Sequence, residues 1–189
     1  LRADRHRFRR RGKQRLNVVS VWKVNTGAVS TNDYILYGAQ NVGDGIFPAA
    51  SATSYIYEVR FSLSSAADSY YAIGVQNGPP FSFAGPPGSG IWVEVTNTAS
   101  AGNWQGITRT GGTSTTITFS PTQTANTSVH VVRFVVTSST VTFFWDGTSV
   151  GSSTTNIPTN VQSPQFEAKT SAAAAKTLNL DTWIFSMKR

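Results

Sequence analysis

The side chains that could catalyse hydrolysis in this chain are carboxylates, and they are few and widely spaced. Glycoside hydrolysis needs two carboxylates on one sugar bond, about 5 Å apart in retaining enzymes and ~6.5–9.5 Å apart in inverting ones. Beyond residue 15, no two acids are closer than ten residues: Asp33, Asp44, Glu58, Asp68, Glu94, Asp146, Glu167 and Asp181. A pair drawn from separate strands, such as Glu58 with Glu94, stays open. The spacing favours surface acids, and we predict that the chain is not an enzyme.

Metal and cofactor chemistry finds equally little support in the sequence. The two histidines, His6 and His130, are far apart, and neither belongs to a pattern with metal-ligand spacing. The chain has no cysteine and no G-x-S-x-G segment of a serine hydrolase. We therefore predict no metal, no cofactor and no catalytic residue, with His130 as a strand residue at the surface or at an interface.

Aromatic rings offer a second kind of chemistry, which is stacking on the flat faces of sugars. The candidate glycan-stacking residues are Tyr70, Tyr71, Trp92 and Trp104. Trp104 lies between polar and glycine residues, and this setting predicts that its ring is the most exposed. The alternative for each ring is a place in the core, because an aromatic-rich sandwich buries most of its rings.

Positive charge is concentrated at the start of the chain. Residues 1–15 contain eight basic residues and one acid, which accounts for the net charge of +7, and the rest of the chain has eight of each. The candidate anion-binding and anchoring residues are Arg5, Arg7, Arg9, Arg10, Arg11, Lys13 and Arg15. Three roles stay open for this arm: contact with nucleic acid through counterion release, docking on an acidic protein subunit, or a solvated tail.

The elements that position these residues are predicted to be strands. Alternating apolar and polar residues and frequent turn signals indicate short strands at 18–24, 34–37, 54–63, 70–76, 91–95, 113–119, 129–136, 141–145, 165–169 and 178–187. The run 171–175 is long enough for one helical turn only. No apolar run reaches the length of a membrane span. We predict an all-β protein: a basic arm at 1–16, and a two-sheet antiparallel jelly-roll sandwich at 17–189.

The second half of the chain resembles a known family. Residues 143–151 (FFWDGTSVG), 155–158 (TNIP) and 176–181 (KTLNLD) are similar to the closing hairpin and last strand of concanavalin A-like lectin/glucanase jelly rolls. Residues 57–75 resemble an early strand pair of the same fold. The resemblance implies that fold, which occurs in phage and virus structural proteins, in lectins and in glycoside hydrolases, so function has to be argued from a site.

The arm, the nearly uncharged body and the scarcity of catalytic groups together predict a structural protein of a virion. We expect a bacteriophage capsid decoration or fibre component, anchored through its arm to the major capsid protein or to copies of itself. Host-surface glycans and nucleic acid are further expected partners. Two alternatives stay open, a carbohydrate-binding module and a jelly-roll coat protein whose arm binds the packaged genome.

Overall fold

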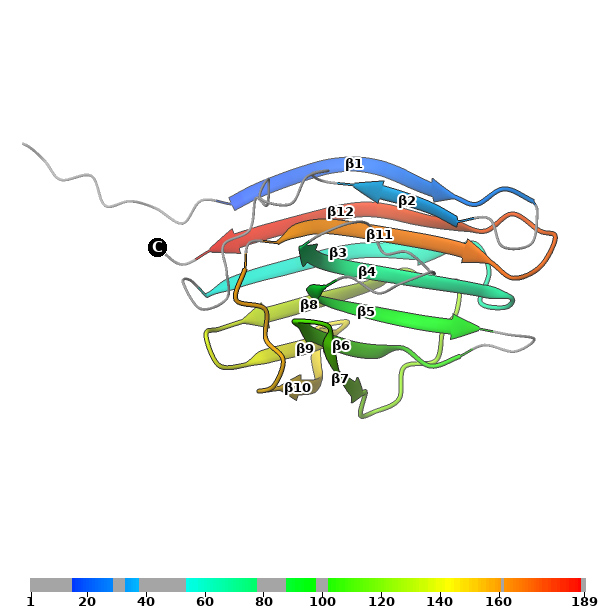
Figure 1. The fold of residues 1–189 in the computed structure, drawn as a ribbon. Coiled ribbons are helices and arrows are strands. Elements are labelled where there is room, and N and C mark those ends of the chain that lie inside the picture. The colour runs from blue at the N-terminus through cyan, green and yellow to red at the C-terminus, as the bar shows by residue number, and fades with distance from the viewer. Residues whose placement is uncertain are drawn as a thin grey trace, which may run out of the picture.

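Two six-stranded antiparallel sheets make up the fold (Figure 1). The computed structural model describes residues 15–28, 33–37, 54–77, 88–97, 102–160 and 162–187, and all regular structure in these ranges is strand. In spatial order, sheet A contains β1 (Arg15–Asn25), β12 (Thr177–Met187), β3 (Tyr55–Leu63), β8 (His130–Val136), β9 (Val141–Trp145) and β10 (Thr148–Ser153). Sheet B contains β2 (Asp33–Tyr37), β11 (Ser163–Thr170), β4 (Ser69–Asn77), β5 (Ser89–Asn97), β6 (Gln105–Thr110) and β7 (Thr113–Thr118).

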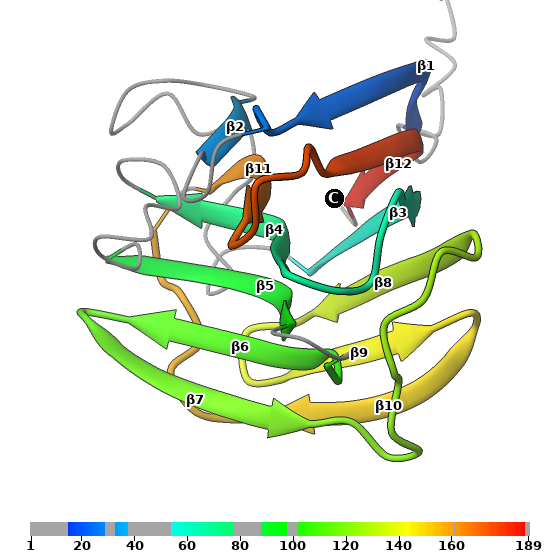
Figure 2. The ribbon, with the colours of Figure 1, turned by 90° about the vertical axis from the view of Figure 1, so that its right-hand side faces the viewer.

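The sheets pack face to face, and the core lies between them (Figure 2). Strand β3 shows how the sequence builds this core, because its residues alternate between buried and accessible positions. Its inward side chains are Tyr55, Tyr57, Val59, Phe61 and Leu63, and all five are buried. The opposite positions carry Glu58 and Arg60 on the outer face of sheet A. The two-residue period of a strand therefore separates the core from the charged surface. Within the described ranges, no residues form a helix with the length and hydropathy of a membrane span.

Strands β7 and β10 bring the two sheets together along one edge of the sandwich (Figure 2). The backbone N–H of Ser120 donates to the carbonyl oxygen of Val150 over 2.9 Å. Gly151 lies so close to the facing strand that a Cβ there would come within 2.6 Å of the Ile117 side chain. A residue without a side chain is therefore needed where the edges of the sheets meet.

Most of the predicted strands are confirmed, and the turns at both ends of β9 lie where the sequence predicts them. Residues 137–140 connect β8 to β9 as a tight hairpin, closed by a 2.8 Å bond from the N–H of Thr137 to the carbonyl of Thr140. Asp146 and Gly147 make the next turn with φ angles of 48° and 86°. The Asp-Gly pair is favoured there because both residues tolerate positive φ. Residues 171–174, which the sequence showed to be too short a run for more than one helical turn, form bends between β11 and β12.

The boundary of the predicted arm lies inside a strand. Arg15 and Leu16 belong to β1, where they pair with Ser186 and Phe185 of β12. The sandwich therefore begins two residues earlier than the sequence predicts. The other anchoring candidates, Arg5, Arg7, Arg9, Arg10, Arg11 and Lys13, lie outside the described residues.

Candidate functional site

One carboxylate on the outer face of sheet B receives hydrogen bonds from three side chains. The indole Nε1–H of Trp92 donates to Oε2 of Glu94 over 2.7 Å, and the hydroxyl of Tyr70 donates to the same oxygen over 3.2 Å. The amide Nε2 of Gln105 donates to the other oxygen, Oε1, over 2.9 Å. We call these four residues the Glu94 cluster. Its donors come from three adjacent strands, so the sheet itself fixes the position of the carboxylate.

The strand register explains why these side chains meet. Glu94 in β5 stands directly opposite Ala72 in β4 and Gln105 in β6. Trp92 and Tyr70 lie two residues from Glu94 and Ala72 along their own strands, and residues two apart in a strand share a face. Because Ala72 has a small side chain, Tyr70 can reach the carboxylate diagonally across it.

The cluster is open to solvent along one side. Tyr70, Glu94 and Gln105 are partly exposed, and Thr96 and Thr118 beside them are exposed. Thr118 in β7 stands opposite Gln105, so the row of partly or fully exposed polar groups continues across that strand. A carboxylate offers about four acceptor positions, and the three donors use three of those of Glu94, which leaves about one for a ligand. No other described group bonds to the side chain of Gln105. The site therefore presents hydrogen-bonding capacity beside the ring of Tyr70.

Two of the four predicted glycan-stacking residues are wrong, because their rings face the core. Trp104 is 2% exposed and packs against Phe61 and Trp145, with ring centroids 5.4 and 5.3 Å away. Tyr71 is 0% exposed, and its hydroxyl donates to the carbonyl of Ser65 over 3.1 Å. Burial raises the pKa of the Tyr71 phenol. Neither ring can meet a ligand.

The other two predicted rings lie on the outer face and belong to the Glu94 cluster. Trp92 is only 3% exposed, so its part in the cluster is to donate to Glu94 rather than to offer a stacking surface. Tyr70 is partly exposed and packs against the buried cluster of Ala72, Trp92 and Ile107. The sequence does not single out Gln105, because nothing in a lone glutamine shows which strand it will face.

The acid pair that the sequence left open does not form. Glu58 lies on the outer face of sheet A, where it lines a hollow of about 420 Å³, and its Oε2 is 3.9 Å from Nη1 of Arg133. Glu94 is on the opposite outer face of the sandwich.

A different acid, Glu167, lies on the same face as Glu94. Glu167 in β11 stands in one register row with Ala72 and Glu94. One strand separates Glu167 from Glu94, so their Cα atoms are ~10 Å apart, and Glu167 is 1% exposed.

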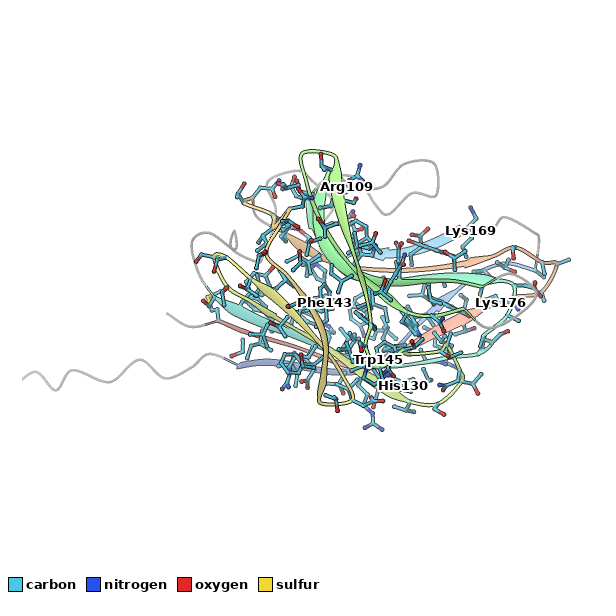
Figure 3. All side chains as sticks on the ribbon, turned by 90° about the horizontal axis from the view of Figure 1, so that it is seen from below. Arg109, His130, Phe143, Trp145, Lys169 and Lys176 are labelled. Atoms are coloured by element: carbon cyan, nitrogen blue, oxygen red, sulfur yellow. The ribbon has the colours of Figure 1, made fainter. Side chains whose placement is uncertain are left out.

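His130 is part of a polar network that joins a loop to a turn. Its Nδ1 lies 2.7 Å from Oδ2 of Asp146, and its Nε2 lies 3.0 Å from Oδ1 of Asn126. Asp146 also accepts the backbone N–H of Val131 over 2.7 Å. The imidazole lies beside the indole of Trp145, with ring centroids 5.0 Å apart (Figure 3). In the part of the chain that the structure describes, no three His, Cys, Asp or Glu side chains are grouped to hold a metal ion. His130 thus fastens the Asp146 turn to the loop before β8.

Comparisons with known proteins bear on the fold. No protein family matches this sequence, and no curated protein matches it. The structure is similar to the carbohydrate recognition domain of Emp47p, with a TM-score of 0.60 and 12% identity over 90% of this chain and 87% of that one. It is also similar to a prokaryotic β-1,3-1,4-glucanase (lichenase) derived from a mouse hindgut metagenome, with a TM-score of 0.60 and 13% identity over 88% and 79% of the two chains.

A third similar structure is the Bacillus licheniformis β-glucanase, with a TM-score of 0.57 and 15% identity over 94% of this chain and 79% of that one. Identities this low show a shared fold only. The fold occurs in binding domains and in enzymes, and it therefore does not exclude catalysis. The predicted virion setting stays a prediction. The chain has the fold of concanavalin A-like lectins and glucanases, an antiparallel jelly roll of two sheets.

Proposed function

We propose that this chain binds carbohydrate through the Glu94 cluster on the outer face of sheet B. The observation that carries the proposal is the convergence of three side-chain donors from β4, β5 and β6 on one partly exposed carboxylate. Ligand sites use a small number of well-placed polar groups to fix orientation, and this cluster is such an arrangement. The similar structures include a carbohydrate recognition domain and glucanases, which supports the same class of ligand.

The groups of the cluster match the chemistry of a sugar. A sugar hydroxyl both donates and accepts, so it can donate to Glu94 and accept from the second amide hydrogen of Gln105. The amide oxygen of Gln105 can accept from a neighbouring hydroxyl. The ring of Tyr70 provides an apolar surface beside these polar groups, as amphipathic aromatic side chains do at interfaces. Because the donors already hold Glu94 in place, a ligand meets a carboxylate whose position is fixed in advance.

Substituting Glu94 with glutamine is expected to weaken glycan binding about 10- to 100-fold. A hydrogen bond to a charged group contributes ~1.5–3 kcal/mol, and the new amide would lose the negative charge and keep one acceptor oxygen in place of two. The measurement is a glycan array, followed by calorimetric titration of mixed-linkage β-glucan oligosaccharides and of any stronger array ligand. The matched control is Glu58→Gln on the outer face of sheet A, which should leave the affinity unchanged. Equal affinity of the Glu94→Gln variant and the wild type would exclude this site.

Glycoside hydrolysis is the second candidate, and the register row of Glu94 and Glu167 is the observation that favours it. Binding has better support, because Glu167 is buried and only Glu94 is accessible. The same oligosaccharides distinguish the two functions when the release of reducing ends is followed over time. If the wild type releases reducing ends and both the Glu94→Gln and Glu167→Gln variants do not, the chain hydrolyses the oligosaccharides as well as binding them.

We also propose that the basic arm anchors the sandwich to an anionic partner. In a virion, that partner is an acidic capsid subunit, another copy of this chain or the packaged nucleic acid. The support is the sequence, where eight of the sixteen Lys and Arg residues lie in the first fifteen positions. Guanidinium groups bind carboxylates and phosphates in a bidentate manner, and arginine is the main basic residue of the arm.

Deleting residues 1–14 is expected to abolish this anchoring while the sandwich stays folded, because β1 begins at Arg15. With random-sequence DNA as the probe, the full chain should bind at 50 mM salt, and its log affinity should fall linearly with log salt. Circular dichroism checks that the truncated chain is folded. If the chain is found on virions, the attachment of the full chain to them is compared with that of the truncated chain. Undiminished binding of the truncated chain to both DNA and virions would refute the role of the arm.

A further inference from the structure

We infer that the Glu94 cluster selects uncharged glycans and rejects sugars that carry a carboxylate or sulfate group at the contacted position. The inference rests on the proposed carbohydrate binding and names the class of ligand for that site. Its basis is the set of groups around Glu94, which differs from the surroundings of the acids on the outer face of sheet A.

The partners of Glu94 are all uncharged. They are a phenol, an indole and a primary amide, and no described basic side chain bonds to this carboxylate. These donors hold the carboxylate in place but leave its charge without a counter-ion.

The acids on the outer face of sheet A are different. Oδ2 of Asp181 lies 2.6 Å from Nε of Arg60, and Oδ2 of Asp146 lies 2.7 Å from Nδ1 of His130. Glu58 lies 3.9 Å from Arg133, whose guanidinium also stacks over the ring of Phe144. Each of these carboxylates has a basic side chain beside it. Glu94 is thus a partly exposed carboxylate that no described basic side chain pairs with, and the other acid of its register row, the buried Glu167, adds no positive charge to it.

The basic residues on the outer face of sheet B do not face a ligand at Glu94. Lys169 stands opposite Tyr70 in the register, but it is only 8% exposed. Arg109 lies four residues beyond Gln105 in β6, ~13 Å along the strand, and its Nη1 donates to Oγ of Ser114 over 2.7 Å. Figure 3 shows Arg109 and Lys169 at different places on the sheet. Among the described residues, an anionic sugar at Glu94 would therefore meet no accessible cation.

Like charges placed together are a common device for rejecting a wrong partner. A neutral sugar donates a hydroxyl hydrogen to Glu94, whereas a uronate or sulfate at the same position has only acceptor oxygens to offer. Such a sugar loses the hydrogen bond and meets repulsion at the same time. We expect its affinity to be at least about tenfold lower than that of the matched neutral sugar.

The test compares one neutral oligosaccharide with its own charged form. The probes are a mixed-linkage β-glucan oligosaccharide, or the strongest neutral ligand from the array, and the same chain oxidised to carry uronate groups. Calorimetric titration of the full chain should show the neutral form binding at least about tenfold tighter at 50 mM salt. The ratio should shrink at 500 mM salt, where charges are screened.

Two variants locate the source of this selectivity. Glu94→Gln removes the charge and should bring the affinity ratio close to one. Thr118→Lys keeps Glu94 and adds a cation opposite Gln105, so it should strengthen binding of the charged chain relative to the neutral one several-fold. The Thr118 variant decides the question even if the Glu94 variant binds neither probe. Glu58→Gln on the far face is the control and should leave the ratio unchanged.

The outcomes separate this inference from the proposed function. If neither the neutral nor the charged chain binds and no array glycan does, carbohydrate binding itself fails. If both chains bind equally well, or the charged one binds tighter, carbohydrate binding stands and the selectivity is overturned. A ratio that stays the same in the Thr118→Lys variant would also overturn it.

Discussion

Replacing Trp104 with alanine is expected to lower the free energy of unfolding by about 3–5 kcal/mol, the range for a large aromatic residue removed from a core. The indole fills the space between the sheets, where it contacts the rings of Phe61 and Trp145. Its backbone N–H is bonded to the carbonyl of Gln123, so the chain on either side cannot easily move into the space left behind. A cavity surrounded by aromatic side chains would remain.

Urea unfolding followed by circular dichroism measures this loss directly, as a lower midpoint with an unchanged slope. The matched control is Trp22→Ala, because Trp22 is 39% exposed on the edge strand β1. That variant should lose much less stability. Equal losses for the two variants would contradict the placement of Trp104 in the core. If Trp104→Ala does not fold at all, Trp104→Phe should show a smaller loss of the same kind.

Strong destabilisation is also expected above pH 10, because two buried tyrosines resist ionisation. Burial raises the pKa values of Tyr55 and Tyr57 well above the ordinary value of about 10. Above pH 10 the unfolded chain loses these protons while the folded chain keeps them. The unfolded state then binds fewer protons, so stability falls as pH rises and is fully present below pH 10.

Each pH unit above 10 should cost about 1.4 kcal/mol for each of the two residues, or roughly 3 kcal/mol at pH 11. The measurement compares urea unfolding at pH 9 and pH 11 for the wild type and the Tyr55→Phe/Tyr57→Phe double variant. Other titrating groups contribute to both proteins and cancel in the comparison. The double variant should lose about 3 kcal/mol less between the two pH values. Parallel losses would show that these hydroxyls ionise in the folded chain.

The strands that the sequence predicted correctly are those whose side chains alternate strongly. Strand β9 matches its predicted bounds because Val141, Phe143 and Trp145 alternate with less buried residues. Strand β6 was missed, and β10 was not predicted from alternation but only implied by the resemblance of residues 143–151 to a hairpin. β6 contains Gly106, where a Cβ would come within 2.9 Å of the Phe143 ring, and β10 contributes Val150 as its buried hydrophobic residue. In both strands, few large apolar side chains point into the core, because side chains of facing strands fill that space. The alternation of apolar and polar residues is therefore weak.

The site was predictable within a strand but not between strands. Alternation in β5 placed Trp92 and Glu94 together on the face opposite Ile91 and Val93, as the structure confirms. The same rule separates Tyr70 from Tyr71, and applying it would have sent Tyr71 to the core. The partner of Glu94 in β6 depends on the register between strands, which local sequence does not contain. The same applies to Trp104, whose polar neighbours suggested exposure although the packing of both sheets buries it.

The pairing of β1 with β12 has a consequence for the order in which the protein assembles during synthesis. Among the described strands, β1 finds its hydrogen-bonding partner only in β12, more than 150 residues later in the chain. The first strand must therefore wait, with its backbone amides unpaired, until residues 177–187 have left the ribosome. Contacts between such distant segments slow folding. The nascent chain consequently depends on its last strand to complete sheet A, and ribosome-bound fragments that end before residue 177 should leave residues 15–25 open to proteolysis.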